Sequence, residues 1–241
     1  MSYSFSGKKV LITGGSRGIG LTLVMELIKK GATVHYTSRR KSNLKHDKRL
    51  VHHKVDFLND NEFNSLIEKV NSLKLDILVN NAGINLLNRI DKLSYIDYDN
   101  MFKVNVKRAF QLTTAVSNSF IDRDTPGKIV NISSIFSITS KESRVIYTST
   151  KEALNGLTKG SALDLANKNI LVNSVLPGFT KTELTDKNLT TSEQKNLEKI
   201  IPIQRLANTI DIVNPIIFLI SDFNTYITGQ KIIVDGGFTI T

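Results

Sequence analysis

A tyrosine and a lysine stand four residues apart in the segment RVIYTSTKEALNGLTKGSAL, residues 144–163, which has the pattern of a helix. Residues i and i+4 lie on the same face of a helix, so the phenol of Tyr147 and the ammonium of Lys151 can approach a common point. A nearby cation lowers the pKa of a tyrosine toward working pH, where proton exchange with a substrate is efficient. An ordinary amphipathic helix can carry the same pair, so the spacing alone does not establish a catalytic site.

The surrounding sequence predicts the elements that would position this pair. Apolar runs of strand length alternate with longer segments of helical period. Strands are expected at residues 8–13, 33–38, 50–56, 76–81, 128–133, 170–175 and 230–236, and helices at residues 18–30, 60–72, 98–120, 147–166 and 209–221. Continuous Val, Ile and Leu runs between helices are typical of a parallel sheet covered on both faces, so we predict a doubly wound α/β fold with about seven strands. Functional residues are then expected just after the apolar runs, because ligands bind beyond the carboxyl ends of such strands.

The composition favours a single globular domain over residues 1–241. Hydrophobic residues make up 40% of the chain and charged residues 22%, which is enough for a sizeable core. No uninterrupted apolar run is long enough to span a bilayer, and the N-terminal residues lack the pattern of a signal peptide. The absence of cysteine excludes disulfides and thiolate metal sites and is compatible with a reducing compartment. We therefore expect a cytoplasmic protein with no membrane partner.

A strongly basic segment lies early in the chain. The formal net charge is +10, and residues 39–54 hold seven Lys or Arg residues against Asp47 alone. Such a segment can bind a nucleic acid, an acidic carrier protein or a phosphate of a cofactor. His46, His52 and His53 also lie there, but without carboxylates at ligand spacing they indicate a solvated surface, and no metal site is predicted. No histidine follows His53, which disfavours a Ser-His-Asp hydrolase.

The first expected strand runs into TGGSRGIG, residues 13–20, at the start of a helix. Gly14, Gly18 and Gly20 allow a tight turn and let backbone N–H groups approach a pyrophosphate at the positive end of that helix. Glycine spacing is weak evidence by itself, but a strand before the turn and a helix after it favour a nucleotide-binding turn.

The end of the second expected strand indicates which cofactor would bind. A site for NAD holds an acidic residue there against the ribose diol, whereas this chain has Ser38 followed by Arg39. An acid would repel a 2′-phosphate, while Arg39 can bind one and Arg17 can approach it from the glycine turn. NADP(H) is therefore predicted over NAD(H), unless Arg39 belongs to a solvated basic surface. Asp56, after the third strand, could accept a hydrogen bond from adenine or cap the next helix.

Several further motifs occur in order along the chain. They are TGGSRGIG, NNAG at residues 80–83, Asn105 in KVNVKRAF, Ser134, YTSTK from Tyr147, VNSVLPGFTKTE and the tail ITGQKIIVDGG. Each consists of ordinary residues, and their order carries the information. Together they resemble the short-chain dehydrogenase/reductase family over roughly the whole chain, closest to its 3-oxoacyl-(acyl-carrier-protein) reductase type. The resemblance implies a single-domain Rossmann-type fold.

The resemblance also implies a role for each of four catalytic residues. Tyr147 would deliver a proton to the substrate carbonyl oxygen as a hydride arrives from the nicotinamide, and would accept it in the reverse direction. Lys151 would lower the pKa of Tyr147 and bind the hydroxyls of the nicotinamide ribose. Ser134 would hydrogen-bond the substrate oxygen, and Asn105 would position a water that connects Lys151 to solvent.

The cofactor contacts follow from the same resemblance. The glycine turn would hold the pyrophosphate, the NNAG segment would lie along the cofactor, and the PGFTKT segment would bracket its nicotinamide end. The cofactor-binding residues expected on this basis are Gly14, Ser16, Arg17, Gly18, Ile19, Gly20, Ser38, Arg39, Asp56, Asn81, Ala82, Gly83, Tyr147, Lys151, Pro177, Gly178, Thr180 and Thr182.

Three functions stay open. The leading one is an NADPH-dependent oxidoreductase that reduces a ketone to a secondary alcohol or the reverse, most specifically a 3-oxoacyl-(acyl-carrier-protein) reductase with a carrier-bound substrate. Polar residues at 137–144, where many family members are glycine-rich, favour a sugar or secondary-metabolite ketoreductase with a small-molecule keto substrate. A non-catalytic NADP(H)-binding regulator that contacts nucleic acid is disfavoured by the intact Tyr147 and Lys151, so no nucleic-acid partner is expected. Residues 183–200 are expected to form a variable substrate lid.

The resemblance further implies a homo-oligomer, most simply a tetramer with twofold axes. The helices expected at 98–120 and 147–166 carry small residues that would permit close packing between subunits. These are Ala109, Ala153, Gly156, Ala162 and Ala166. A helix that covers its own sheet has a similar pattern, so the sequence does not decide between the two.

Overall fold

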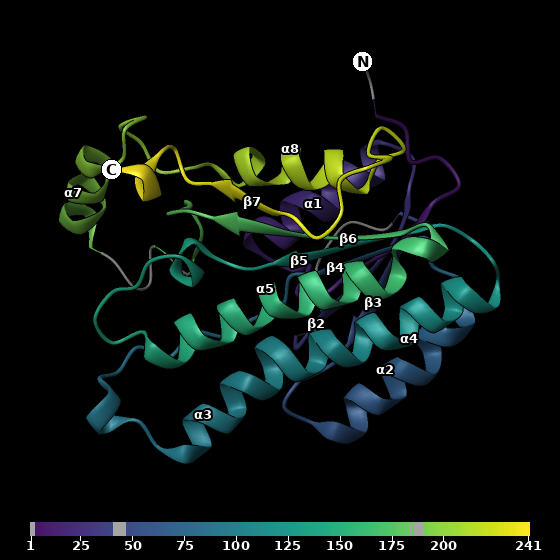
Figure 1. Ribbon diagram of the computed structural model, residues 1–241, viewed down its shortest axis with the longest axis horizontal. Coiled ribbons are helices and arrows are strands. Elements are labelled where there is room, and N and C mark those ends of the chain that lie inside the picture. The colour runs from purple at the N-terminus through teal and green to yellow at the C-terminus, as the bar shows by residue number, and fades with distance from the viewer. Residues whose placement is uncertain (1–2, 41–46, 184, 186–189) are drawn as a thin grey trace.

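The computed structural model describes residues 3–40, 47–183, 185 and 190–241, which form one parallel sheet with helices on both sides (Figure 1). The sheet has seven strands in the order β3-β2-β1-β4-β5-β6-β7. The strands are β1 (Lys9–Ile12), β2 (Thr33–Ser38), β3 (Leu50–Lys54), β4 (Ile77–Asn80), β5 (Gly127–Ile132), β6 (Ile170–Pro177) and β7 (Lys231–Val234). The order reverses between β1 and β4, where doubly wound sheets bind their ligands. The predicted fold class is confirmed.

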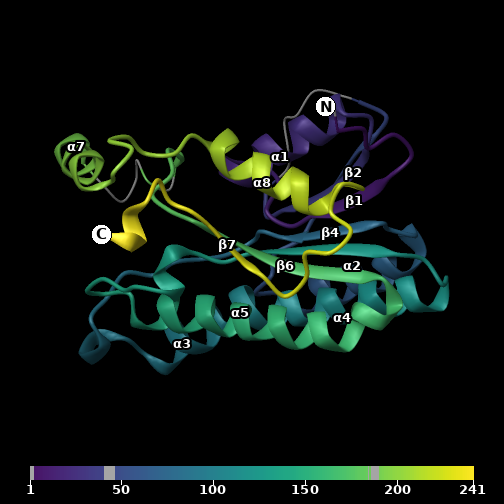
Figure 2. The same ribbon diagram turned by 45° about the horizontal axis from the view of Figure 1, so that its top comes forward.

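Helices cover both faces of this sheet (Figure 2). α1 (Gly18–Lys29) and α8 (Thr209–Ile220) pack on one face, and α2 (Asp60–Leu73), α4 (Arg108–Asp122) and α5 (Val145–Leu165) pack on the other. α3 (Tyr95–Phe102) leads toward α4, and α7 (Thr191–Ile200) lies near the C-terminus. The short helices are η1 (Ile90–Lys92), η3 (Ile135–Ser137), η4 (Ala166–Lys168) and η5 (Phe238–Ile240). Within the described ranges, no helix is long and apolar enough to cross a membrane.

Successive residues of the central strand pack into two separate cores. In β1, Val10 and Ile12 belong to the core under α1 and α8, whereas Leu11 belongs to the core under α2, α4 and α5. Side chains alternate between the faces of a strand, and all three residues are fully buried. The strands therefore read as continuous apolar runs, because both of their faces require an apolar residue.

The helix predicted over residues 98–120 begins earlier and is interrupted. It begins at Tyr95, because Ser94 and Asp97 form a capping box in which each side chain accepts the backbone N–H of the other. Residues Lys103–Lys107 then form a π turn (η2) between α3 and α4. The prediction of one continuous helix was wrong here, because a local change of helical period does not alter the apolar pattern enough to be read from it. Asn105 lies inside this turn, a type of distortion that is frequent at functional sites.

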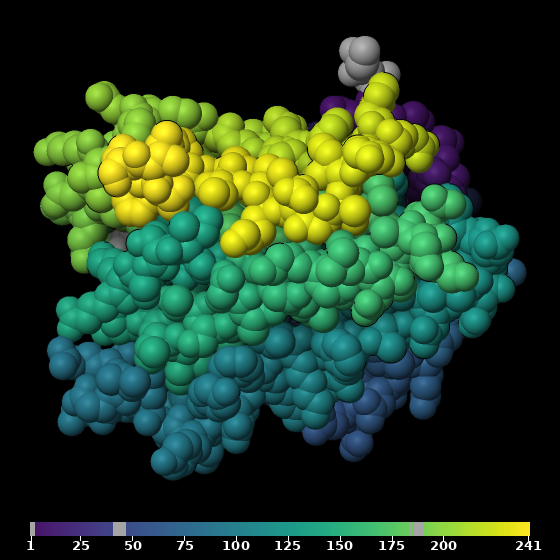
Figure 3. Space-filling model, viewed as in Figure 1, coloured from purple at the N-terminus to yellow at the C-terminus, as the bar shows by residue number. Residues whose placement is uncertain are grey.

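A helix that was not predicted, α7, lies within the expected lid. Thr190 and Glu193 form a capping box at its start, and this T-x-x-E spacing was the available signal. Leu197 of α7 packs in a small apolar core to which Phe179 and Phe238 contribute. Figure 3 shows the C-terminal segment, coloured yellow, on the surface next to the teal and green elements of the middle of the chain.

Two predicted segments fall partly outside the described residues. The lid expected at 183–200 includes residues 184 and 186–189, and the basic segment 39–54 includes residues 41–46. The described parts of the basic segment are residues 39–40 and 47–54, and the remainder of the lid segment is largely α7.

Arg108, at the start of α4, fastens this helix to the α2 side of the sheet. Its side chain is 1% exposed and lies over the ring of Phe63, with Cζ 4.1 Å from the ring centroid. Its Nε donates to the carbonyl of Phe57 at 2.8 Å, and its guanidinium pairs with the exposed carboxylate of Asp60. Hydrogen bonds from Lys103 and Arg108 lower the pKa of Asp60 to about 2. The cluster therefore fixes the connection between β3 and α2.

Replacing Arg108 with leucine is expected to lower the free energy of unfolding by about 2 to 4 kcal/mol, because the buried carbonyl of Phe57 loses its donor and Asp60 its partner. Urea denaturation followed by circular dichroism measures this loss. Arg205→Leu is the matched control, since Arg205 pairs with Asp211 at 46% side-chain exposure, and exposed pairs contribute about 0 to 1 kcal/mol. Equal losses in the two variants would contradict a structural role for the buried cluster.

Candidate active site

A cavity of about 740 Å³ lies beyond the carboxyl ends of the central strands. Its walls come from the turns that follow β1 to β6 and from the first turns of α5. The residues predicted for the site line this cavity, with the exception of Asn105. The topology thus brings together side chains as distant in sequence as Gly14 and Thr182, because parallel strands end at one edge of the sheet.

The turn between β1 and α1 fits an anionic group. α1 begins at Gly18 without a side-chain cap and without an acidic residue in its first turn. Gly18 has a φ of +53°, and a Cβ on Gly20 would lie 2.3 Å from the carbonyl oxygen of Gly14, so both positions require glycine. N–H groups at a helix start that no side chain caps can bind an anion. The turn is therefore suited to the pyrophosphate of a dinucleotide.

Thr13 and Asn81 hold this turn in place. Thr13 Oγ1 accepts the backbone N–H groups of Asn81 and Ala82, each at 2.9 Å. Asn81 Nδ2 donates to the carbonyl oxygens of Thr13 and Gly14 at 2.9 and 3.1 Å. Asn81 thus uses its side-chain amide to brace the glycine turn. This role of Thr13 was not predicted, although a threonine directly before the glycine turn was the signal that could have indicated it.

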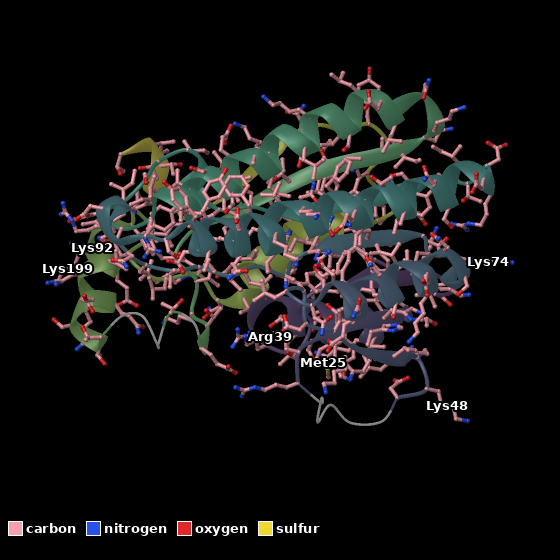
Figure 4. The ribbon with its side chains drawn as sticks, turned by 90° about the horizontal axis from the view of Figure 1, so that it is seen from below. Met25, Arg39, Lys48, Lys74, Lys92 and Lys199 are labelled. Atoms are coloured by element: carbon pink, nitrogen blue, oxygen red, sulfur yellow. The ribbon has the colours of Figure 1, made fainter. Side chains whose placement is uncertain are left out.

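Arg17 and Arg39 line the cavity with exposed side chains, and neither takes part in an ion pair among the described residues. Figure 4 shows Arg39 toward the middle of the molecule in this view, while Lys48 extends outward at the edge. Ser38 is buried, donates to the carbonyl of Arg40 at 2.6 Å and lies 2.8 Å from His52 Nε2. This part of the cavity is therefore positively charged and has no acid at position 38.

Asp56 does not cap the helix that follows it. Asn59 is the N-cap of α2, since its side chain accepts the N–H groups of Asn61 and Glu62. The carboxylate of Asp56 accepts the N–H of Leu58 at 3.0 Å, and Asp56 lines the cavity. Asp56 was predicted either to cap this helix or to accept a hydrogen bond from adenine, and only the second role is compatible with the structure.

Tyr147 and Lys151 lie one turn apart on α5. Lys151 is 4% exposed, donates to the carbonyl of Ile132 at 2.8 Å, and places Nζ 5.5 Å from the centroid of the Tyr147 ring. Burial lowers the pKa of Lys151 to about 8. Burial raises the pKa of Tyr147, whereas a hydrogen bond with Ser134 and the charge of Arg144 act in the opposite direction. Lys151 was predicted to lower the pKa of Tyr147, but its ammonium donates to the carbonyl of Ile132 instead.

Buried hydrogen bonds fasten α5 to the sheet. They join Ser133 Oγ to the carbonyl of Lys151 at 2.8 Å, Asn131 Nδ2 to Thr158 Oγ1 at 2.9 Å, and Ser174 Oγ to Asn155 Oδ1 at 3.0 Å. Hydrogen bonds are directional, so these pairs fix how far α5 is shifted along β5 and β6. The position of the tyrosine and lysine over the sheet follows from that register.

Ser134 follows β5 and caps the short helix η3. Its Oγ accepts the N–H of Phe136 at 3.2 Å, and the residue is 7% exposed. The same hydroxyl lies close enough to the phenol of Tyr147 to lower its pKa, which places both groups where one carbonyl oxygen could contact them.

Asn105 lies behind the cavity wall. Its side chain is 1% exposed, accepts the N–H of Ile84 at 2.8 Å, and donates to the Ile84 carbonyl at 2.9 Å and to Thr150 Oγ1 at 3.1 Å. A Cβ on Gly83 would lie 3.3 Å from Asn105 Oδ1 and 3.5 Å from Lys151 Nζ, so these two polar atoms flank Gly83. The π turn aims Asn105 at the segment after β4 and at α5 together.

The segment after β6 forms another wall. The N–H of Gly178 donates to the carbonyl of Val234 at 2.9 Å, which attaches the segment to β7. Thr180 Oγ1 donates to the Gly178 carbonyl at 3.0 Å, and Thr182 Oγ1 lies 3.1 Å from Thr185 Oγ1. These hydroxyls stabilise the loop conformation that lines the cavity.

Two aromatic residues that the sequence analysis did not assign also line the cavity. The ring centroid of Phe136 lies 6.4 Å from that of Tyr147 and 5.9 Å from that of Phe179, both in edge-to-face geometry. Phe136 comes just after β5 and Phe179 just after β6, and this position was the signal that could have indicated them. They give the tyrosine end of the cavity an apolar wall.

Comparisons with known proteins agree with this arrangement. A family model described as enoyl-(acyl carrier protein) reductase matches residues 14–239. The chain is 35% identical to a 3-oxoacyl-(acyl-carrier-protein) reductase of Buchnera aphidicola, over 97% of this chain and 98% of that protein. It is also 35% identical to an L-rhamnose 1-dehydrogenase (NADP(+)) of Thermoplasma acidophilum, over 98% of both. A solved structure of a 4-hydroxyisoleucine dehydrogenase mutant, complexed with NADH and succinate, matches with a TM-score of 0.93 at 31% identity, over 97% of this chain and 99% of that one.

Replacing Lys151 with methionine is expected to raise the free energy of unfolding at pH 7 by about 1 to 3 kcal/mol, because the folded chain buries a charged amine. The folded pKa of about 8 lies below the ordinary 10.5. From pH 8 upward the unfolded state therefore binds more protons at this position than the folded state, and the unmodified chain gains stability relative to the variant. The difference in the free energy of unfolding between Lys151→Met and the unmodified chain should be constant below pH 8 and decrease between pH 8 and 10.

Urea denaturation at pH 7, 8, 9 and 10 measures that difference. Lys159→Met, which changes an exposed lysine of the same helix, is the control. Its difference in the free energy of unfolding from the unmodified chain should not decrease in this way as the pH rises. A Lys151→Met advantage that did not change with pH would contradict the buried-charge explanation.

Proposed function

The chain belongs to the short-chain dehydrogenase/reductase family of oxidoreductases, and we propose that it is an NADPH-dependent enzyme that reduces a ketone to a secondary alcohol or catalyses the reverse reaction. One observation carries this proposal: a single cavity is lined by Tyr147, Lys151 and Ser134 and also by the glycine turn before α1. A proton donor next to a dinucleotide-binding turn is what a carbonyl reduction requires of a protein.

Each residue has a definite task in this proposal. NADPH, when bound, would supply the hydride. The uncapped start of α1 would hold its phosphates together with Arg17 and Arg39, which make no ion pair among the described residues. Tyr147 donates a proton to the substrate oxygen from its phenol, whose pKa burial raises, so that the protonated form that the reducing direction requires is favoured. Ser134 donates a hydrogen bond to the same oxygen as negative charge develops there. The positive charge of Lys151 stabilises the phenolate that remains.

The proposed preference for NADP(H) is supported by local charge. Arg17 and Arg39 line the cavity without acidic partners among the described residues, and Ser38 places no carboxylate against a 2′-phosphate. Similarity does not decide the matter, because the name of the rhamnose dehydrogenase specifies NADP(+), whereas the 4-hydroxyisoleucine dehydrogenase structure holds NADH.

Two substrate classes have separate support. A 3-oxoacyl-(acyl-carrier-protein) reductase activity is supported by the Buchnera relative, by the family model, and by the basic segment 39–54, which suits an acidic carrier. A small-molecule ketoreductase activity is supported by the rhamnose dehydrogenase at equal identity and by Arg144, a charged residue lining the cavity beside Tyr147. A purely regulatory NADP(H)-binding role has no comparable support.

We also propose that residues 1–241 form one domain and that residues 183–200 act as a lid over the cavity. Glu183 and Thr185 line the cavity, and α7 continues this segment. A lid formed by such a segment would exclude water while the proton and hydride are transferred.

A homotetramer remains a proposal from family likeness. Of the small residues named for subunit packing, Ala109 and Ala162 are buried in the chain's own core, so they are accounted for without a partner. Gly156 and Ala166 are exposed on α5 and η4, near Leu163, which is 83% exposed. A subunit contact would therefore use the outward face of α5.

Tyr147→Phe is expected to abolish turnover with every ketone while leaving NADPH binding nearly unchanged, because it removes the transferable proton and retains the ring. Steady-state kinetics and fluorescence titration of NADPH measure the two quantities. Ser134→Ala should lower kcat by about 10²- to 10³-fold, as for the loss of one oxyanion donor. Retention of most of the activity in the Tyr147→Phe variant would contradict the proposed mechanism.

The unmodified chain is expected to favour NADPH over NADH by about thirtyfold in kcat/KM, a difference of about 2 kcal/mol after screening of exposed arginines. The double variant Ser38→Asp, Arg39→Gln should reverse this preference, because it adds a repelling carboxylate and removes a donor. Lys48→Gln is the control, since Lys48 belongs to the same basic segment but does not line the cavity. Equal values of kcat/KM for NADPH and NADH in the unmodified chain would indicate that Arg39 belongs to a solvated surface instead.

A further inference from the structure

Arg144 is a cation at the tyrosine end of the cavity that the proposed reaction does not use. It is the N-cap residue of α5, three positions before Tyr147, and it lines the cavity together with Phe136 and Phe179. Residues i and i+3 of a helix start are neighbours, separated by about 5 to 6 Å at Cβ. The Arg144 guanidinium and the Tyr147 ring both lie beside the ring of Phe136, at 4.6 and 6.4 Å from its centroid, so a short ligand could contact both.

Within the part of the chain that the structure describes, the guanidinium of Arg144 makes no ion pair or hydrogen bond. No ion pair among the described residues includes it, and the nearby Glu142 pairs with Arg89 instead at 2.9 Å. Its Nε is buried and has no hydrogen-bond partner in the described part of the chain. A buried donor without an acceptor is unfavourable, so a ligand that supplies an acceptor recovers a lost interaction. Burial correspondingly lowers the pKa of Arg144.

A second unpartnered group lines the same cavity. The side chain of Asn85 has a buried Oδ1 without a hydrogen-bond partner among the described residues. The oxygen and nitrogen of an amide exchange places by rotation, so Asn85 can also present N–H donors. The chain segments of the two residues are joined, since the N–H of Asn88 donates to the carbonyl of Ser143 at 3.1 Å. Two unpartnered polar side chains, one of them cationic, indicate a site for an oxyanion.

The orientation of Arg144 favours a planar anion. Its Cζ lies 4.6 Å from the centroid of the Phe136 ring, so the guanidinium is held against an aromatic face. A guanidinium in a fixed plane matches the two oxygens of a carboxylate. The edge-to-face rings of Phe136 and Phe179 provide an apolar wall that suits a short carbon skeleton between the carboxylate and the carbonyl.

We propose that Arg144 binds the carboxylate of the substrate, and that the substrate is a short free oxo acid, or the corresponding hydroxy acid in the reverse direction, rather than a carrier-bound thioester. This inference rests on the proposed oxidoreductase function and selects its substrate class. A thioester has no carboxylate beside its ketone and would leave the Arg144 guanidinium unpaired. Arg144 is thus a specificity-determining residue that distinguishes an acid from its ester.

The experiment compares acids with their methyl esters in the unmodified chain. The probes are 2-oxo, 3-oxo, 4-oxo and 5-oxo acids of four to six carbons, with freshly dissolved acetoacetate as the 3-oxo acid, and acetoacetyl-N-acetylcysteamine as a neutral thioester. For at least one chain length, kcat/KM for the acid should exceed that for its ester by about 10- to 100-fold, as for a charge-assisted hydrogen bond. A series in which no acid is preferred over its ester overturns the proposal.

Arg144→Gln should remove the preference by lowering kcat/KM for the acid, mainly through KM, while the ester changes little. Arg144→Lys should restore part of the preference, because it keeps the charge without the planar donor pair. Arg89→Gln is the matched control, since Arg89 is an exposed arginine nearby that does not line the cavity, and it should keep the full preference. If Arg144→Gln lowers kcat/KM equally for the acid, the ester and the thioester, Arg144 only supports Tyr147 and the proposal is wrong.

Calorimetric binding separates this inference from the proposed function. The same acids and esters are titrated into the chain in the presence of NADP⁺, with near-unchanged NADP⁺ affinity as the check that each variant is folded. Acid-selective binding that Arg144→Gln abolishes supports the carboxylate site even if no ketone is turned over, in which case the proposed reductase function alone fails. Equal binding of acid and ester overturns the carboxylate site even if ketones are reduced.

Discussion

The hydrogen bonds that join α5 to β5 and β6 are the interactions on which the candidate site depends. Apolar contacts alone would let the helix shift along the sheet at little cost, whereas the pairs Ser133 to Lys151 and Asn131 to Thr158 have one acceptable register. That register sets where Tyr147 stands relative to Ser134 and to the glycine turn. Because these polar groups are buried, a displaced helix would leave donors unpaired, which is strongly unfavourable.

Desolvation is the second constraint, and it acts on every charged group near the tyrosine. Lys151 is almost fully buried and its pKa falls to about 8, so its positive charge is held at a cost to stability. Burial of the phenol raises the tyrosine pKa, and the arginine three residues earlier counteracts this. A site that gathers unpaired cations around a cavity is less stable than one that pairs them, and it becomes satisfied when anionic ligands bind. Arg17 and Arg39 near the glycine turn, and Arg144 near the tyrosine, are therefore interpreted as cations that bind anionic groups of ligands.

Much of the architecture could be predicted from the sequence, and the errors have physical causes. The strand positions followed from continuous apolar runs, because a strand buried on both faces cannot alternate with polar residues. The interrupted helix around Asn105 escaped prediction, since a π turn alters the period by one residue over a single turn. The short helix α7 was missed because its apolar face is small, although its capping box was present. Small residues such as Ala162 could equally serve a core or a subunit contact, and only burial showed that this alanine belongs to the core.

By itself, the sequence determined the α/β class, the order of its motifs and the spacing of Tyr147 and Lys151, because these depend on periodicity and on residue type within short segments. The tertiary structure alone decided which polar groups are desolvated and which have partners. Arg144 illustrates the difference: its position before Tyr147 is visible in the sequence. Its contact with Phe136, and the lack of a hydrogen-bond partner for its Nε among the described residues, depend on segments that meet only in the fold. Desolvation and pairing are properties of the whole surrounding shell, and that shell is assembled from residues far apart in the chain.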